Sequence, residues 1–262
     1  MFMTRLWVIL MVEQIIKAFP KEIKQVKSDS DVIKISEMFA DTLQGEGIHI
    51  GYPATFIRVQ NCSLNCKWCD STEVWRKGNP YTIDEIINLM EDYNVINKLK
   101  AGQHLILTGG SPLSYQKQFV KLINRIKLDY SFKPYIEVEN ECTIMPIKEF
   151  SDIVDCWNNS PKLFNSGMKK ELRYKPEVIK YLLTQNSWWK FVVREEDEWD
   201  EIVRDYIKPN NIPYDKVLLM PEGQTREELQ QHYEAVIDMA TKYNIKVTDR
   251  LHITIFNKKT GV

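Results

Sequence analysis

Short apolar runs, separated by polar or amphipathic stretches, recur along most of the chain. The runs are rich in Ile, Val, Leu and aromatic residues, a composition that favours buried β-strands. The predicted strands are Ile33–Met38, Ala54–Val59, His104–Leu107, Tyr135–Glu139, Ile153–Trp157, Trp189–Val193, Val217–Met220 and Lys246–Leu251.

Helical patterns lie between several of these runs. Thr82 and Glu85 form a capping box, which marks the start of a helix. Helices are also predicted over Tyr115–Lys127, Asp197–Tyr206 and Thr225–Tyr243, where Thr225 is an N-cap. Strands that alternate with helices predict an α/β fold with a parallel sheet, whose functional residues follow the strands. The candidate loops are Leu43–Gly47, Cys62–Ser71, Thr108–Pro112, Glu139–Thr143, Ser160–Lys162 and Met220–Gly223.

Three cysteines with the spacing Cys-x3-Cys-x2-Cys follow one of the predicted strands, at Cys62, Cys66 and Cys69. Three thiolates can hold three irons of a 4Fe-4S cluster and leave the fourth open, as reductive cleavage of S-adenosylmethionine requires. The alternative is a zinc site, for which His49 or Cys142 would have to be the fourth ligand. Neither has the spacing of a zinc finger, so the pattern favours the cluster.

A second motif, Thr108-Gly-Gly-Ser-Pro-Leu113, comes directly after a predicted strand. The paired glycines, Gly109 and Gly110, allow a close approach of the backbone to a ligand. We expect that ligand to be the amino group of S-adenosylmethionine. Many radical enzymes carry Glu after these glycines, whereas Ser111 stands here, so that a hydroxyl or a backbone carbonyl would replace the carboxylate.

Four further residues near the cysteines are candidates for ligand contacts. Arg58 has apolar neighbours on its predicted strand, and a buried guanidinium favours an anion such as a substrate carboxylate. Asp70 and Ser71 offer hard oxygen ligands for magnesium, or alternatively cap the next turn. Trp68 lies between two cysteines, where it packs, shields a cluster or flanks an adenosyl group.

The composition is that of an ordinary globular protein of 262 residues, 44% of them apolar. A net charge of −1, from 35 basic and 36 acidic residues, gives no indication of a nucleic-acid or anionic-membrane surface. Five cysteines, three of them clustered, do not suggest a disulfide framework and fit a metal site in a reducing cytoplasm.

The first residues are predicted to precede the catalytic domain. The apolar run Leu6–Val12 is too short to span a bilayer, and no small-residue cleavage site follows it. It is predicted to be a short amphipathic helix or an extension, and the charged segment Lys21–Asp31 a linker. We therefore divide the chain into an extension and linker, residues 1–31, and one catalytic domain, residues 32–262.

Taken together, the motifs resemble those of the 7-carboxy-7-deazaguanine synthases, from about Ile33 to the C-terminus. The cysteine loop marks only the radical S-adenosylmethionine superfamily, and the other segments narrow the resemblance to this family. They are Leu43-Gln-Gly-Glu-Gly47, a strand ending near Arg58, Cys69-Asp-Ser71, Thr108-Gly-Gly110, Ser160-Pro-Lys162, Lys190-Phe-Val-Val193 and the tail from Leu251-His252 to Val262.

The resemblance implies a modified, incomplete (β/α) barrel of the radical S-adenosylmethionine type, forming a homodimer in the cytoplasm. It implies a carbon–nitrogen lyase that converts 6-carboxy-5,6,7,8-tetrahydropterin to 7-carboxy-7-deazaguanine and ammonia, a step towards queuosine and other 7-deazapurines. The implied cofactors are a 4Fe-4S cluster, S-adenosylmethionine and Mg²⁺. The implied partners are the pterin and a reductase such as a flavodoxin or ferredoxin, with no nucleic acid and no membrane.

The resemblance also assigns residues to ligands. Cys62, Cys66 and Cys69 hold the cluster, and Ser71, where many members have Thr, binds magnesium. The residues expected at S-adenosylmethionine are Trp68, Asp70, Gly109, Gly110, Ser111, Glu139, Ser160, Lys162, Met220, Pro221, Glu222 and Gly223. The residues expected at the substrate are Leu43, Gln44, Gly45, Arg58, Thr108, His252 and, in a tail whose length departs from that of shorter members, Val262. No side chain is assigned as a general acid or base.

Two other functions remain open at this point. One is a different radical enzyme, such as an activase that makes a glycyl radical on a partner protein. The other is a zinc-stabilised binding module without catalytic turnover.

Overall fold

The structure is a computed structural model that describes residues 12–22, 24 and 31–261. The strands are β1 (Glu13–Ile16), β2 (Val32–Leu43), β3 (Pro53–Val59), β4 (Asn79–Thr82), β5 (His104–Gly109), β6 (Tyr135–Asn140), β7 (Cys156–Asn159), β8 (Ser187–Val193), β9 (Val217–Pro221) and β10 (Lys246–Val247). The helices are α1 (Thr72–Trp75), α2 (Ile83–Asp92), α3 (Val95–Lys100), α4 (Gln116–Tyr130), α5 (Lys148–Ser151), α6 (Lys170–Arg173), α7 (Pro176–Leu182), α8 (Asp197–Glu201), α9 (Lys208–Asn210), α10 (Arg226–Tyr243) and α11 (Leu251–Phe256). Shorter helical segments are η1 (Pro112–Tyr115), η2 (Phe164–Ser166), η3 (Ile202–Ile207) and η4 (Tyr214–Lys216).

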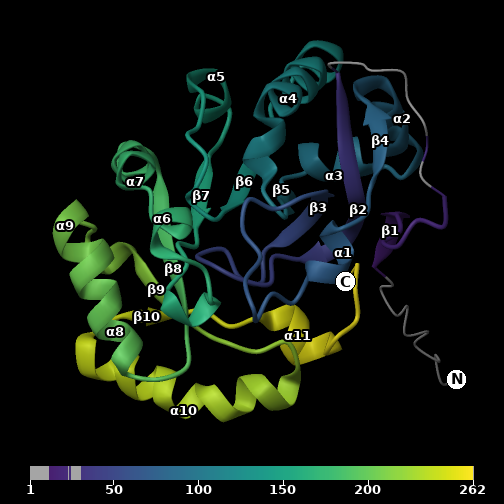
Figure 1. Ribbon diagram of the computed structural model, residues 1–262. Helices are drawn as coiled ribbons and strands as arrows, with labels where there is room; N and C mark the ends of the chain where they lie inside the picture. Colours follow the sequence, from purple (N-terminus) through teal and green to yellow (C-terminus); the bar gives the residue numbers. More distant parts are fainter. Residues whose placement is uncertain (1–11, 23, 25–30, 262) are drawn as a thin grey trace, which may run out of the picture.

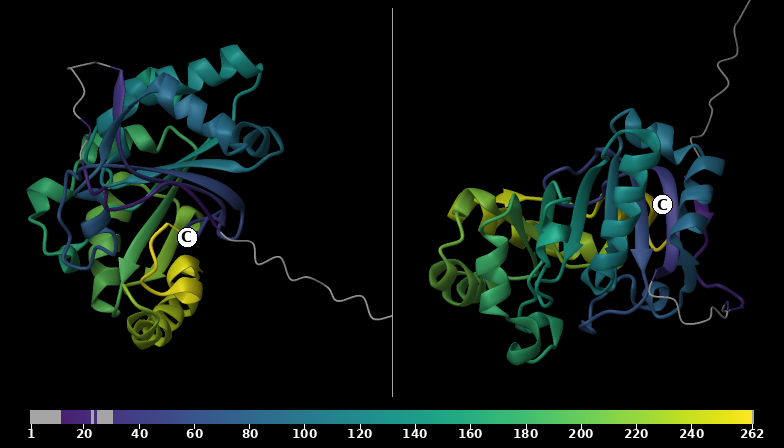
Figure 2. Two further views of the ribbon diagram at one scale, coloured as in Figure 1. Left: turned by 90° about the vertical axis from the view of Figure 1, so that its right-hand side faces the viewer. Right: turned by 90° about the horizontal axis from the view of Figure 1, so that it is seen from above.

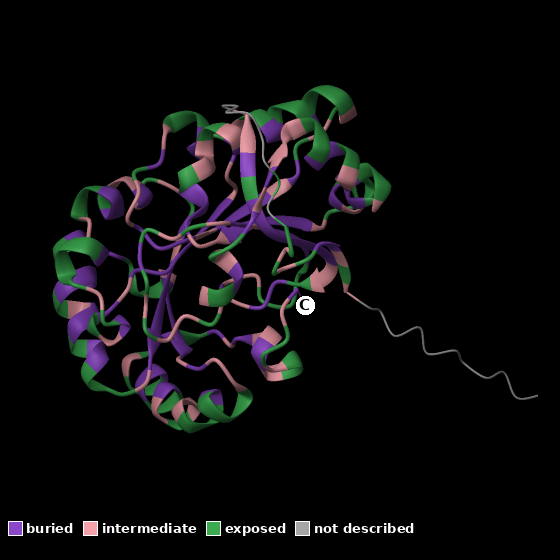
Figure 3. Cartoon of the chain, turned by 45° about the vertical axis from the view of Figure 1, so that its right-hand side comes forward, coloured by how far each residue is buried: buried purple, intermediate pink, exposed green. Residues whose placement is uncertain are grey.

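One ten-stranded sheet organises the molecule, in the order β1-β2-β3-β5-β6-β7-β8-β9-β10, with β4 paired to β2. No described pairing joins β1 to β10, so the barrel that the sheet begins to form stays open (Figure 1). The helices cover its outer side, and the buried residues lie in and around the sheet (Figure 3). The expected incomplete (β/α) barrel is therefore confirmed.

The sheet is parallel from β3 to β10, as predicted, but its first part is not. The strand predicted over Ile33–Met38 is present within β2, but the expected parallel direction was wrong there, because β2 runs antiparallel to β1, β3 and β4. The short loop 44–52, closed by the bond from Gln44 N to Tyr52 O at 2.7 Å, reverses the chain between β2 and β3. So short a loop cannot hold the crossover that a parallel pair needs.

Other predicted elements differ at their ends. The strand predicted over Ile153–Trp157 begins only at Cys156, because Ile153 lies in the turn after α5. The strand predicted over Lys246–Leu251 ends after Val247, since the chain then turns into the barrel and Leu251 N bonds to Gly45 O at 2.8 Å. The helix predicted over Asp197–Tyr206 is α8 followed by the π-helical η3.

Both predicted N-caps are present. Thr82 N donates to Glu85 Oε2 at 2.9 Å, and Glu85 N donates to Thr82 Oγ1 at 3.2 Å, which completes the capping box. Glu228 N donates to Thr225 Oγ1 at 3.1 Å at the start of α10.

The sheet is open between its edge strands β1 and β10, and the C-terminal segment runs back towards β1 (Figure 1 and Figure 2). Gln14 Nε2 on β1 donates to the carbonyl oxygens of Thr260 at 3.1 Å and Gly261 at 3.3 Å. Thus β1, which the sequence did not predict, ties part of the expected N-terminal extension to the tail. The helix or extension predicted over Leu6–Val12 lies, except for Val12, outside the described residues.

Among the helices that the structure describes, none has the length and apolar character needed to cross a membrane.

Candidate active site

The cysteine loop follows β3 and rests on the loop after β5. Ser111 N donates to Asn61 O at 2.8 Å, and Ser63 N donates to Ser111 Oγ at 2.8 Å. The contact is so close because of the two glycines. A Cβ on Gly110 would lie 1.8 Å from Asn61 O, and one on Gly109, where φ is +133°, would lie 2.4 Å from Val59 O. The glycines therefore let the cysteine loop approach, besides leaving room for a ligand.

The three cysteines are half-buried, unpaired thiols with nearby hydrogen-bond donors. Leu64 N lies 3.4 Å from Cys62 Sγ, and Trp75 Nε1 lies 3.5 Å from Cys69 Sγ. Burial, with the charge of Glu141, raises the pKa of Cys62 to about 11, and burial raises the pKa of Cys66. Thiols of this kind are deprotonated by a bound metal, and N–H donors to sulfur are typical of iron–sulfur sites. The loop therefore fits a cluster.

The geometry does not favour zinc. Ligands of one zinc ion lie within about 4 Å of one another, given Zn–S bonds of about 2.3 Å. The two groups of His, Cys, Asp and Glu that converge this closely among the described residues contain no cysteine. Of the two candidate fourth ligands, His49 lies 3.1 Å from Glu137, and Cys142 is buried against Asn140.

The cysteines line a cavity of about 1120 Å³ on the inner side of the barrel. Single small-molecule sites measure about 300–1,000 Å³, so the cavity has room for more than one ligand. Most of the predicted ligand residues are on its wall: Leu43, Gln44, Gly45, Arg58, Trp68, Asp70, Ser71, Thr108, Gly109, Gly110, Glu139, Ser160, Lys162, Met220 and His252. Ser111, Pro221, Glu222 and Gly223 are not among the residues that line it, and Val262 lies outside the described residues.

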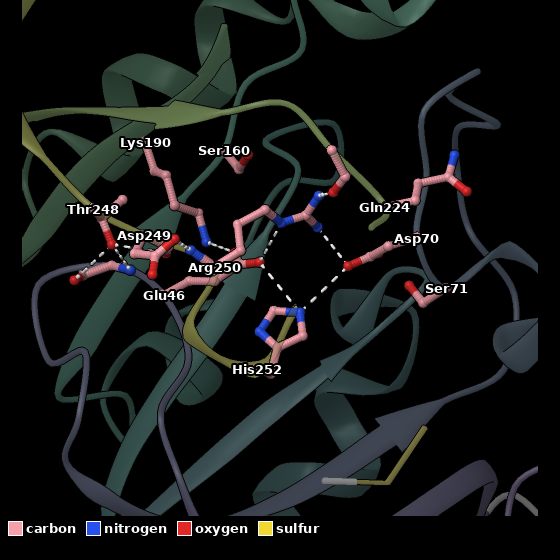
Figure 4. Close-up of polar contacts among 12 residues, drawn as sticks. Glu46, Asp70, Ser71, Ser160, Lys190, Gln224, Thr248, Asp249, Arg250 and His252 are labelled. Carbon is pink, nitrogen blue, oxygen red and sulfur yellow. Dashed lines mark hydrogen bonds and ion pairs between the residues drawn. The ribbon is translucent and has the colours of Figure 1, made fainter. Parts of the chain in front are cut away.

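A network of ion pairs crosses one end of this cavity (Figure 4). Lys190 Nζ lies 2.5 Å from Glu46 Oε2 and 2.8 Å from Glu139 Oε2. Arg250 Nε lies 3.1 Å from Glu46 Oε1, and the same guanidinium pairs with Asp70 and donates to the carbonyl of Gly223 at 2.6 Å. The network thus joins the loop after β2, the cysteine loop and the loop after β9.

Three members of this network were given no ligand role in the sequence analysis, namely Glu46, Lys190 and Arg250. Lys190 carries the same signal as Arg58, because its neighbours Trp189 and Phe191 on β8 are apolar. That signal could have identified it. Arg250 gave no comparable signal, because the residues before it, Thr248 and Asp249, are polar.

His252 lies beside the network, with Nε2 at 3.5 Å from Asp70 Oδ2 and 3.9 Å from Glu46 Oε1. Burial alone would raise the pKa of Glu46, but Lys190, Arg250 and His252 outweigh it and hold that pKa at about 2. Burial likewise opposes ionisation of Asp70, but Arg250 and His252 lower its pKa well below the usual range. Both carboxylates are therefore ionised at neutral pH.

The predicted substrate and magnesium residues have the following surroundings. Arg58 Nε already pairs with Glu37 Oε1 at 2.6 Å, so this buried guanidinium has a carboxylate partner within the protein. Ser71 precedes α1 and its side chain makes no capping bond; its hydroxyl lies on the cavity wall, 3.8 Å from Cys69 Sγ. Asp70, in contrast, is engaged by Arg250 and His252.

Trp68 and Lys162 lie together beside the cysteine loop. Trp68 Nε1 donates to Asn165 Oδ1 at 3.1 Å, which fixes the indole on the cavity wall. Lys162 Nζ lies 5.4 Å from the centre of the Trp68 ring and donates to Ser160 Oγ at 2.8 Å. These contacts bring three of the residues predicted at S-adenosylmethionine to one part of the cavity.

An open (β/α) barrel with a cysteine triad after its first parallel strand defines a class, the radical S-adenosylmethionine type of iron–sulfur protein. Residues 43–151 match a family described as a 4Fe-4S single cluster domain. The 7-carboxy-7-deazaguanine synthase of Pyrobaculum aerophilum is 31% identical over 231 residues, 87% of this chain and 97% of that protein. The enzyme of the same name from Rhodopirellula baltica is 30% identical, over 89% of this chain and 90% of that protein. The chain belongs to the 7-carboxy-7-deazaguanine synthase family.

The fold has a solved counterpart in the crystal structure of QueE from Escherichia coli. The TM-score is 0.62 at 20% sequence identity, and the match covers 84% of this chain and 95% of that one. At this identity the likeness concerns the fold, and it agrees with the open barrel described above.

Proposed function

We propose that the chain converts 6-carboxy-5,6,7,8-tetrahydropterin to 7-carboxy-7-deazaguanine with loss of ammonia. The observation that carries this proposal is one large cavity whose wall contains both the cysteine triad and buried charged residues. Cys62, Cys66 and Cys69 would hold a 4Fe-4S cluster, which when bound would supply the electron for the cleavage of S-adenosylmethionine. The chain's own residues position the ligands and exclude water from them.

The roles of the residues follow from their places on the wall. Trp68, Ser160 and Lys162 adjoin the cysteine loop and would contact S-adenosylmethionine. Gln44 and Thr108 would contact the pterin, whose carboxylate Arg58 and His252 would bind. The Ser71 hydroxyl would bind Mg²⁺, with waters or substrate oxygens as the other ligands.

The proposal extends to partners that lie outside this structure. A cluster of this kind needs an external electron donor, which we propose to be a flavodoxin or ferredoxin. We also propose a homodimer that works in the cytoplasm. Residues 32–262 would form the catalytic domain, to whose sheet β1 adds a strand from the preceding segment.

The test is an anaerobic incubation of the reconstituted protein with the carboxypterin, S-adenosylmethionine, dithionite and magnesium. We expect a product lighter than the pterin by one ammonia, detected by mass spectrometry. Because this conversion is redox-neutral, the hydrogen abstracted from the pterin must be returned, and 5'-deoxyadenosine should not accumulate in proportion to the product. If 5'-deoxyadenosine forms without that product, the substrate is a different one, as it would be in a glycyl-radical activase. A colourless zinc protein that forms neither compound would contradict the cluster as well.

The role of Arg58 can be tested separately. Replacing Arg58 alone would leave Glu37 buried without its cation, so the double variant R58Q/E37Q is the better probe. We expect kcat/KM for the pterin to fall about 10- to 100-fold, because a charge-assisted contact to its carboxylate is lost. E37Q alone retains the guanidinium and an amide oxygen that can still accept from Arg58 Nε, so it serves as the control. An unchanged KM for the pterin in the double variant would contradict this role.

A further inference from the structure

A second group of possible metal ligands lies near the amino ends of the strands, away from the cysteine loop. His104 is the first residue of β5, Glu137 lies on the neighbouring strand β6, and His49 belongs to the loop 44–52 between β2 and β3. One ligand atom from each residue lies within 4.8 Å of the other two. None of the three lines the cavity that contains the cysteine triad, so the group is a separate site.

The three side chains converge on one carboxylate oxygen. Glu137 Oε1 lies 2.5 Å from His104 Nδ1 and 3.1 Å from His49 Nδ1. His49 Nδ1 is buried, and it has no well-directed hydrogen bond in the described part of the chain. Two imidazole nitrogens and a carboxylate oxygen are a common ligand set of zinc. Ligands of one zinc ion lie about 3.3 Å apart, so the contact between His104 and Glu137 would widen by about 0.8 Å.

The surroundings hold two of these ligands in fixed orientations. The His104 ring is stacked between the rings of Tyr52 and Tyr135, with centroid distances of 3.9 Å and 4.1 Å. Asn158 Nδ2 donates to Glu137 Oε2 at 2.8 Å, which leaves Oε1 directed at the histidines. Outer partners that orient the ligands in this way are typical of metal sites. The site is therefore arranged before an ion binds.

The charge of Glu137 also favours a bound cation. Its side chain has no exposed surface, and a buried carboxylate requires a compensating charge. No Lys or Arg of the described residues forms an ion pair with it, and its only such contacts are the two histidines. The other convergent group contains Glu46 and Asp70, which already have Lys190 and Arg250 as cations. Glu137 thus offers an ion a negative charge without a permanent cation.

We propose that His49, His104 and Glu137 bind a divalent transition-metal ion such as zinc, which ties the loop 44–52 to β5 and β6. Two imidazole ligands favour such an ion over magnesium, which prefers oxygen. Three protein ligands leave one position for water, and the His49 side chain, 29% exposed, gives access from solvent. The same loop carries Gln44 and Gly45, which line the large cavity, so the ion would hold that part of its wall.

The test measures zinc binding to the full chain with its cluster reconstituted, so that iron occupies the cysteine triad. Zinc alone is the probe, in anaerobic equilibrium dialysis with and without millimolar magnesium, and zinc and iron are counted by mass spectrometry. The variants are H49Q, which removes a ligand from a loop, and the control H232Q. His232 lies on α10, where its Nδ1 contacts the carbonyl oxygen of Glu222.

We expect the unaltered protein to bind about one zinc ion per chain, and magnesium not to displace it. H49Q should weaken zinc binding by more than about 100-fold, because loss of an outer hydrogen-bond partner alone costs about 10- to 100-fold. H232Q should keep the full affinity. Zinc should also raise the midpoint of urea unfolding for the unaltered protein and H232Q, but not for H49Q.

The proposal is wrong if the unaltered protein binds no zinc, if magnesium displaces it, or if H49Q binds it as tightly. The three residues would then form a hydrogen-bonded group without a metal. E137Q covers the case in which H49Q does not fold; it keeps the side-chain shape, and it should lose zinc to the same extent because it lacks the charge. Neither S-adenosylmethionine nor pterin is present, so this site and the proposed function hold or fail independently.

Discussion

Replacing Cys66 by alanine abolishes the cleavage of S-adenosylmethionine, whereas replacing Cys156 by alanine leaves it intact. Cys66 lies in the loop after β3 with its thiol on the cavity wall, and its loss leaves two thiolates for a cluster that needs three. Cys156 is fully buried at the start of β7 and is not on that wall. Iron content, visible absorption and 5'-deoxyadenosine formation are measured after the same anaerobic reconstitution.

Cys156→Ala is a matched control because it also removes a thiol and creates a small core cavity. The Cys156→Ala protein should be somewhat less stable, as large-to-small core changes are, but it should still bind iron. Iron binding and cleavage at unaltered levels in the Cys66 variant would contradict the cluster assignment. A loss of iron in both variants would mean that the cluster depends on general core packing and would leave the triad without a special role.

Much of this site could be predicted because it follows from local pattern. The cysteine spacing, the paired glycines after β5 and an arginine among apolar residues are each visible within a few positions of the sequence. The same holds for most strands, whose apolar runs mark where the chain enters the core. Since strands end at the barrel mouth, the loops that follow them meet there, and most of the predicted residues do line one cavity.

What could not be predicted depends on contacts between distant segments. Ser111 and Glu141 come from loops after neighbouring strands, and their hydrogen bond exists only because β5 and β6 pair in one register. The antiparallel direction of β2 was missed for the same reason. An apolar run predicts a strand, but it does not show whether that strand pairs parallel or antiparallel with its neighbours. Glycine offers a related case, because the approach at Gly110 is to the backbone of Asn61, which follows another strand.

Arg250 makes the most extensive contacts between distant segments of the site. Its guanidinium pairs with Glu46 after β2 and Asp70 in the cysteine loop, and it donates to the carbonyl of Gly223 after β9. The side chain is only 5% exposed. One residue from the C-terminal part of the chain therefore connects the three loops that the cofactor and substrate would contact, which makes it a structural requirement of the site.

We expect Arg250→Gln to lower the free energy of unfolding by about 3–5 kcal/mol, because it removes the principal cation of the buried Asp70 and one of the two main cations of Glu46. Affinity for S-adenosylmethionine should fall with it, since Asp70 and the cysteine loop lose an anchor. The control is Arg204→Gln, whose side chain is 67% exposed and whose partner Asp205 also pairs with Lys170. Because the Arg204 guanidinium is exposed and Asp205 keeps Lys170 as a partner, we expect a loss of only about 0–1 kcal/mol. Equilibrium urea unfolding of the reconstituted proteins measures both.

The difference between the unaltered protein and Arg250→Gln should also depend on pH. Burial opposes ionisation of Glu46, but its cations hold its pKa at about 2, below the usual value of 4.5. A lowered pKa stabilises the folded state above about pH 5, and this contribution is lost as the pH falls towards 2. The variant lacks the part of that shift due to Arg250, although Lys190 keeps its own, so the difference between the two unfolding free energies should shrink on acidification. A difference that stays constant from pH 7 to about pH 3 would mean that Arg250 stabilises the fold through packing and its bond to Gly223, and not through the two carboxylates.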